Sequence, residues 1–226
     1  EAVKLVEKYF PFEKVKGEVS HLAFDMDASG SEHITLQTKK TEQAHLVCGV
    51  RGLPAEHEDH YVLKVLSAIL GGGMSSRMFS AVREEKGLAY YISSGTEDYA
   101  DTGVFFTRAG VDVNRITDAV KAIVEEYDKI RHVEISDAEL KKGKEYLKGK
   151  LVLALEDSEE VAQMGARHEL LYGKLKNYNE IAKEIDAVKV ADVKRVAMEL
   201  LKDDSLYLSV IGPYEDKAMF EKVLKF

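Results

Sequence analysis

The sequence predicts an α+β fold in which helices cover one face of a single, mostly antiparallel sheet. The expected strands come in pairs joined by short connections, which favours antiparallel pairing over a βαβ winding. Helical periodicity then dominates from about residue 114 onward. With 226 residues, 45% of them hydrophobic and 32% charged, the chain has the composition of a globular protein.

The amino-terminal part differs in pattern from the rest. A short apolar run predicts a helix over residues 2–10, which Pro11 ends. One strand is expected around residues 21–26. We therefore expect residues 1–30 to be an entry helix with a linker, and residues 31–226 to be a single α+β domain.

Two strands and a helix are expected next. Alternating apolar residues predict strands over residues 33–39 and 44–50. A Gly-Leu-Pro sequence at 52–54 breaks the pattern, and apolar residues at helical spacing then predict a helix over 60–70. Three consecutive glycines end this helix.

A second helix is expected over residues 76–86, with Ser75 as its cap and Gly87 as its stop. Alternation returns at residues 89–97 and 103–111, which predicts two further strands separated by a short turn.

The remainder is predicted to be mostly helical. Ser136 and Glu139 form the pattern of a capping box, and Asp157 and Gly173 can begin and end the helix that follows. Apolar residues on one side of each segment predict helices over residues 114–130, 136–155, 157–173, 179–185, 189–201 and 214–224, and alternation predicts a strand over 205–211.

Composition excludes several classes of protein. A net charge of −8 and the lack of a basic stripe argue against nucleic acid as a partner. No apolar run approaches the roughly 20 residues that cross a bilayer, so no membrane is expected. The chain has a single cysteine, Cys48, which excludes an intramolecular disulfide and fits a cytoplasmic protein. Cys48 lies in an expected strand, where we expect its side chain to act as a small hydrophobic group. Because Glu1 replaces an initiator Met, we expect a longer gene product.

Of seven histidines, only His57 and His60 lie close together. Three residues apart on a helix they share a face and could reach one metal, with the neighbouring acidic residues as further ligands. The alternative is an acidic helix start with no metal. Neither His-x-x-x-His nor His-x-x-Glu-His occurs in the sequence, and we predict no metal site in this chain.

The glycine run Gly71, Gly72, Gly73 precedes a helix start, as a phosphate-binding loop does. It lacks the Gly-Lys-Ser/Thr end of a P-loop and the spaced glycines of a dinucleotide loop. A flexible turn between two packed helices is the alternative interpretation.

Arg83 lies on an expected helix and Tyr90 at the start of an expected strand, with a bend at Gly87 between them. This spacing can direct a guanidinium and a phenol toward one place. Neither group is a base near neutral pH, but together they can hold a carbonyl oxygen and stabilise a developing oxyanion. The alternative is a surface charge and a tyrosine at the edge of the core.

The run from Gly71 to Tyr90 resembles the signature of the C-terminal, non-zinc half of the pitrilysin, insulinase and mitochondrial processing peptidase family. Residues 40–46 resemble its strand before the helix pair, 99–103 a turn between strands, and 156–173 its late helices. The resemblance covers about residues 30–212.

In that family two homologous halves face each other around a closed chamber. One half carries the zinc motif, and the other supplies an Arg and a Tyr that bind the substrate backbone. The resemblance assigns these roles to Arg83 and Tyr90, with Arg77 and Tyr91 as the nearest competitors. It also implies that Gly71 to Gly73 contact substrate.

Because the zinc motif is absent, the resemblance implies that zinc is held by the partner half and that this chain alone is inactive. The main interpretation is the substrate-binding half of a zinc metalloendopeptidase that hydrolyses peptides or unfolded protein segments. Its zinc-bearing half would lie upstream in the same chain or on a separate subunit. The alternatives are a non-catalytic structural subunit, as in the core of respiratory complexes, and a peptide-binding module that uses a sheet edge.

Overall fold

A computed structural model describes residues 1–11 and 32–226 of the chain. Its sheet has five strands in the order β1-β5-β2-β4-β3. Three of the four pairings are antiparallel and only β1 with β5 is parallel, which confirms a mostly antiparallel sheet. The strands are β1 (Ile34–Thr38), β2 (Gln43–Gly52), β3 (Ala89–Asp98), β4 (Gly103–Asp112) and β5 (Tyr207–Gly212).

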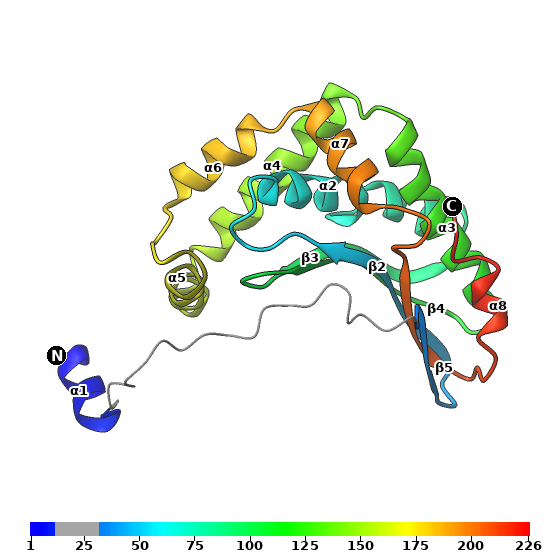
Figure 1. Cartoon of the computed structure of the whole chain (residues 1–226), viewed down its shortest axis with the longest axis horizontal. Helices are drawn as coiled ribbons and strands as arrows, with labels where there is room; N and C mark the ends of the chain where they lie inside the picture. Colours follow the sequence, from blue (N-terminus) through cyan, green and yellow to red (C-terminus); the bar gives the residue numbers. More distant parts are fainter. Residues whose placement is uncertain (12–31) are drawn as a thin grey trace.

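Helices form a layer over one face of this sheet (Figure 1). The helices of the described residues are α1 (Ala2–Tyr9), α2 (His60–Gly71), the π-helix η1 (Phe79–Glu85), α3 (Ile116–His132), α4 (Asp137–Ala154), α5 (Ser158–Tyr172), α6 (Tyr178–Ala187), α7 (Val190–Leu200) and α8 (Ala218–Glu221). Of these, α1 buries no residue and is not part of the layer (Figure 1). No helix in this part of the chain has the length and apolar character to span a membrane.

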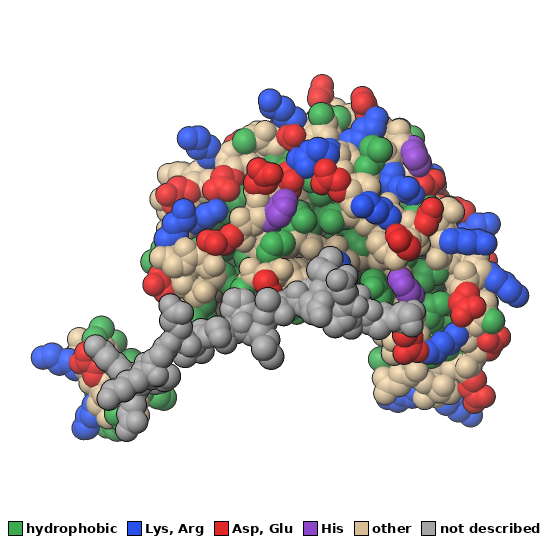
Figure 2. Space-filling model, viewed as in Figure 1, with side chains coloured by type: hydrophobic (Ala, Val, Ile, Leu, Met, Phe, Trp, Pro, Cys, Tyr) green, Lys and Arg blue, Asp and Glu red, His purple; other side chains and the backbone are tan. Residues whose placement is uncertain are grey.

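Side chains on the two faces of the sheet differ in burial, because helices cover only one face. In β2 the side chains of Ala44, Leu46 and Cys48 are buried, whereas His45 and Val47 between them are exposed. Acidic and basic side chains are interspersed over the helical layer, without a stripe of one sign (Figure 2). The alternation seen in the sequence thus separates a helix-covered face from an open face.

A buried polar network ties the sheet to α3. The Tyr127 hydroxyl donates to the Cys48 carbonyl oxygen at 3.1 Å and lies 2.7 Å from the Thr107 hydroxyl, which is 2.7 Å from that of Ser94. Satisfied partners make such a network compatible with a core. It holds β2, β3 and β4 at a fixed distance from the helical layer.

The helix ends predicted at Ser136, Asp157 and Gly173 are confirmed, whereas the cap predicted at Ser75 is wrong. The π-helix η1 begins only at Phe79, after Met78, and has no side-chain cap. The Ser136 hydroxyl accepts from the Glu139 amide at 3.2 Å, and the Asp157 carboxylate accepts from the Glu159 amide at 2.8 Å. Gly173 takes the left-handed conformation, with φ of 60°, that ends α5.

The last helix is shorter than predicted. We expected residues 214–224, but α8 covers only Ala218–Glu221. Tyr214 is held outside a helix because its hydroxyl donates to the Val113 carbonyl at 2.7 Å and its own carbonyl accepts from the Thr38 hydroxyl. The strand expected near residues 21–26 and the domain boundary at residue 30 lie outside the described residues.

Candidate functional site

The turn between η1 and β3 connects the two elements that carry the predicted site residues, Arg83 and Tyr90. The Leu88 amide donates to the Val82 carbonyl at 2.9 Å, so the chain folds back beside Arg83 just before Tyr90. Gly87 has φ of 57°, a left-handed conformation that glycine adopts without steric cost. This closed turn brings the end of the helix and the start of the strand together.

Arg83 is exposed on η1, and its guanidinium lies over the Phe79 ring, 4.8 Å from the centroid. Among the residues that the structure describes, it has no ion pair. A π-helical turn is rare and occurs frequently at functional sites. The guanidinium is therefore oriented by stacking while its donors remain available.

Tyr90 lies in a β-bulge. The register passes from Ala89 opposite Val111 to Tyr91 opposite Gly110, so Tyr90 has no partner residue on β4. Its side chain is 54% exposed. Bulges redirect side chains and are enriched beside active sites. This one points Tyr90 away from the regular alternation of the strand.

The two competitors have structural partners. Arg77 is half-buried and binds the Glu139 carboxylate through two nitrogens, at 2.9 and 3.3 Å. The Tyr91 hydroxyl lies 3.0 Å from His45 Nδ1, and its ring covers Gly110, where a Cβ would come within 2.4 Å of it. Among the described residues, Arg83 and Tyr90 have no such hydrogen-bond or ion-pair partner, which favours them over Arg77 and Tyr91. Their role in binding substrate remains a prediction.

Helix α3 holds the turn in place. Arg115 donates to the Gly87 carbonyl at 3.3 Å and to the Lys86 carbonyl at 3.4 Å, and the Lys86 ammonium binds Glu125 at 2.7 Å. The hydrogen bond from Lys86 lowers the pKa of the Glu125 carboxyl. Sequence reasoning missed Arg115 because nothing local marks it. The bulge had one available signal, the adjacent Tyr90 and Tyr91, which interrupt alternation.

The glycine run is a close-packed junction. A Cβ on Gly71 would lie 2.2 Å from the Ser94 amide nitrogen, and one on Gly72 would lie 2.8 Å from the Tyr146 ring. Gly73 is also near that ring, at 3.2 Å. Glycine is needed so that α2 can approach β3 and α4. The substrate contact predicted for Gly71, Gly72 and Gly73 remains a prediction.

Within residues 1–11 and 32–226 the His57 and His60 pair does not form a zinc site. His57 Nδ1 accepts from the Asp59 amide at 3.0 Å, while His60 Nδ1 lies 3.8 Å from the Asp98 carboxylate. Burial lowers the pKa of His60 to about 4. Residues 1–11 and 32–226 contain no group of three His, Cys, Asp or Glu side chains suited to a metal.

Cys48 is completely buried, and burial raises the pKa of its thiol to about 12. A thiol in this environment is not a nucleophile near neutral pH. This location agrees with the structural role that the sequence predicts.

The fold is that of a metallopeptidase half. A protease from Helicobacter pylori matches 93% of this chain and 52% of its own, with a TM-score of 0.78 and 25% identity. A chain of complex III from Candida albicans shares the fold, with a TM-score of 0.74 and 23% identity over 87% of this chain and 50% of its own. The chain belongs to the peptidase M16 inactive domain family, whose model matches residues 1–147.

Curated relatives support this assignment. An uncharacterised zinc protease of Bacillus subtilis, YmxG, is 37% identical over 93% of this chain and 51% of its own length. An uncharacterised zinc protease of Mycobacterium leprae is 33% identical over 100% of this chain and 51% of its own length. The chain thus spans about half the length of these relatives. The resemblance to the non-zinc half is confirmed.

Proposed function

We propose that this chain is the substrate-binding, non-zinc half of a zinc metalloendopeptidase. Its partner is a homologous zinc-bearing half, upstream in the same chain or on a separate subunit, and peptides or unfolded protein segments are cut in a chamber between the two. The observation that supports this most is the exposed Arg83 and Tyr90 pair, carried by a π-helix and a β-bulge on either side of one turn.

The two side chains act by hydrogen bonding. The Arg83 guanidinium and the Tyr90 hydroxyl donate to the carbonyl oxygen of the peptide bond to be cut, and so stabilise the negative charge that develops there. Neither residue removes a proton near neutral pH. The chain therefore positions substrate and depends on its partner for hydrolysis, so it is inactive alone.

Arg83→Ala and Tyr90→Phe test this role in the enzyme assembled with its zinc-bearing half. Each variant should lower turnover by about 100-fold, the effect of losing one oxyanion donor, with zinc content unchanged. Tyr91→Phe is the matched control and should retain turnover, since the Tyr91 hydroxyl contacts His45. Unchanged turnover in Arg83→Ala would overturn the assignment.

A non-catalytic structural subunit is the second candidate, supported by the fold shared with the complex III chain. A peptide-binding module is the third. If either alternative holds, the zinc-loaded assembly would hydrolyse no peptide. Arg83→Ala would then leave assembly with the partner unchanged. The cytoplasm is the proposed compartment, because the one cysteine is an unpaired buried thiol.

A further inference from the structure

Helix α5 is a long helix that contributes no buried residue to the core. None of its fifteen residues is buried, whereas ten of the twelve residues of α2 are. Isolated helices of about this length are marginal in water, so most helical stability in proteins comes from packing. Figure 1 shows α5 below the layer formed by α2, α4 and α6.

One face of α5 lines an apolar hollow. Its residues on that face recur every three or four positions, as one side of a helix does. The hollow has a volume of about 780 Å³, and the end of α4 and the turn after β3 complete its walls. Its apolar lining includes Leu151, Leu155, Met164, Leu170 and Leu171, with Glu160 and Arg167 among its charged residues.

Some large apolar side chains in the hollow's lining, and others outside it, are well exposed. Leu153, Leu170 and Leu175 are 69%, 85% and 66% exposed. Exposed apolar side chains, together with an apolar hollow that has a few charged residues in its lining, are typical of a protein–protein contact. We call α5, the end of α4 and Leu175 the α5 surface.

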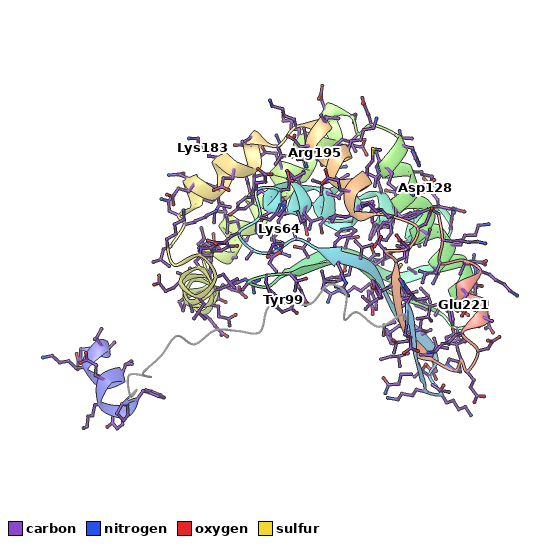
Figure 3. All side chains as sticks on the ribbon, in the orientation of Figure 1. Lys64, Tyr99, Asp128, Lys183, Arg195 and Glu221 are labelled. Carbon is purple, nitrogen blue, oxygen red and sulfur yellow. The ribbon has the colours of Figure 1, made fainter. Side chains whose placement is uncertain are left out.

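Hydrogen bonds at the edge of α5 hold the helix in place, and one of them involves Arg167 of the hollow's lining. Arg167 donates to the Asp98 carbonyl at 2.7 Å, and His168 Nδ1 accepts from the Lys176 amide at 3.3 Å. Asp98 is in turn bound by Lys64 of α2 at 2.7 Å. Figure 3 shows Lys64 among the helices and Tyr99, next to Asp98, below the sheet. The hollow is therefore part of a positioned surface.

We propose that the α5 surface is where the homologous zinc-bearing half docks. The relatives are about twice as long as this chain, so each contains a second portion of similar size. A portion in the same polypeptide has a high effective concentration and can cover a surface of modest apolar area. This inference rests on the proposed function only in naming that portion as the zinc-bearing half.

Amide hydrogen exchange of the complete protein, compared with this chain alone, tests the proposal. The α5 amides should exchange at least about 10-fold more slowly in the complete protein. Leu153→Asp with Leu170→Asp should remove this protection. Met198→Asp, at a side chain that is 52% exposed on α7, is the matched control and should leave it unchanged. Circular dichroism of each variant verifies folding.

Equal exchange of α5 in both forms would overturn the proposal. So would protection in the isolated chain that depends on its concentration and disappears in Leu170→Asp, because the occupant would then be a second copy. If the α5 amides are protected in the complete protein and Arg83→Ala keeps full turnover, the docking surface is supported. The function proposed for Arg83 and Tyr90 is then rejected.

Discussion

Arg83 and Tyr90 each lie where regular secondary structure is interrupted. The π-helix places Arg83 over Phe79, and the bulge removes Tyr90 from pairing with β4. Such irregularities are retained where they aim a side chain. The neighbouring Arg77 and Tyr91, of the same residue types, are occupied by Glu139 and His45. Residue type alone does not separate these two pairs, whereas their contacts do.

His60 makes the stability of the fold depend on pH. Burial is the main cause that lowers its pKa from 6.5 to about 4. The positive charges of Lys64, Lys176 and Arg167 lower this pKa further, whereas the Asp98 carboxylate raises it. Below about pH 6.5 the unfolded chain takes up a proton that the folded chain rejects. The free energy of unfolding should therefore fall as the pH drops from about 6.5 to about 4.

Urea denaturation at several pH values measures this effect, with His60→Gln as the comparison. The variant should lose the part of the pH dependence between pH 6.5 and 4 that His60 contributes, while the carboxylates keep theirs. Parallel pH profiles for the two proteins would show that His60 takes up its proton equally in the folded and unfolded states, and would contradict the lowered pKa.

At the scale of elements, the start of α3 positions the turn that carries Tyr90. Arg115→Ala removes both hydrogen bonds to the carbonyls of Lys86 and Gly87. Turnover of the assembled enzyme should fall by about 10-fold, since small displacements of a binding group are costly. Steady-state kinetics measure this loss of turnover. The control is Arg131→Ala, at the other end of α3.

A double variant distinguishes positioning from a general loss of stability. If Arg115 acts through Tyr90, then Arg115→Ala should lower turnover much less in a Tyr90→Phe background. Fully additive losses would mean that Arg115 contributes to the enzyme by another route.

At the scale of the whole molecule, zinc is expected to stabilise the partner and not this chain. Removing metal with EDTA should leave the melting temperature of this chain unchanged, because its described residues lack a metal cluster. The same treatment should abolish activity of the complete protein. Differential scanning calorimetry with and without EDTA measures the first, and a drop of several degrees would reveal a site in this chain.

The sequence by itself determined the element types, the caps at Ser136 and Asp157, and the family. These follow from local periodicity, from side chains that bond their own backbone, and from one extended motif. The sequence also singled out Arg83 and Tyr90, through the resemblance. Each of these signals is contained in a short stretch of chain, so it can be read without knowing the fold.

Only the tertiary structure decided which contacts join distant stretches. The glycine run proved to be a packed junction because Ser94 and Tyr146 approach it from β3 and α4. Arg77 meets Glu139 across 62 positions, and Arg115 reaches Gly87 across 28. These contacts depend on how sheet and helices pack, since the folded backbone brings together groups that no local pattern relates.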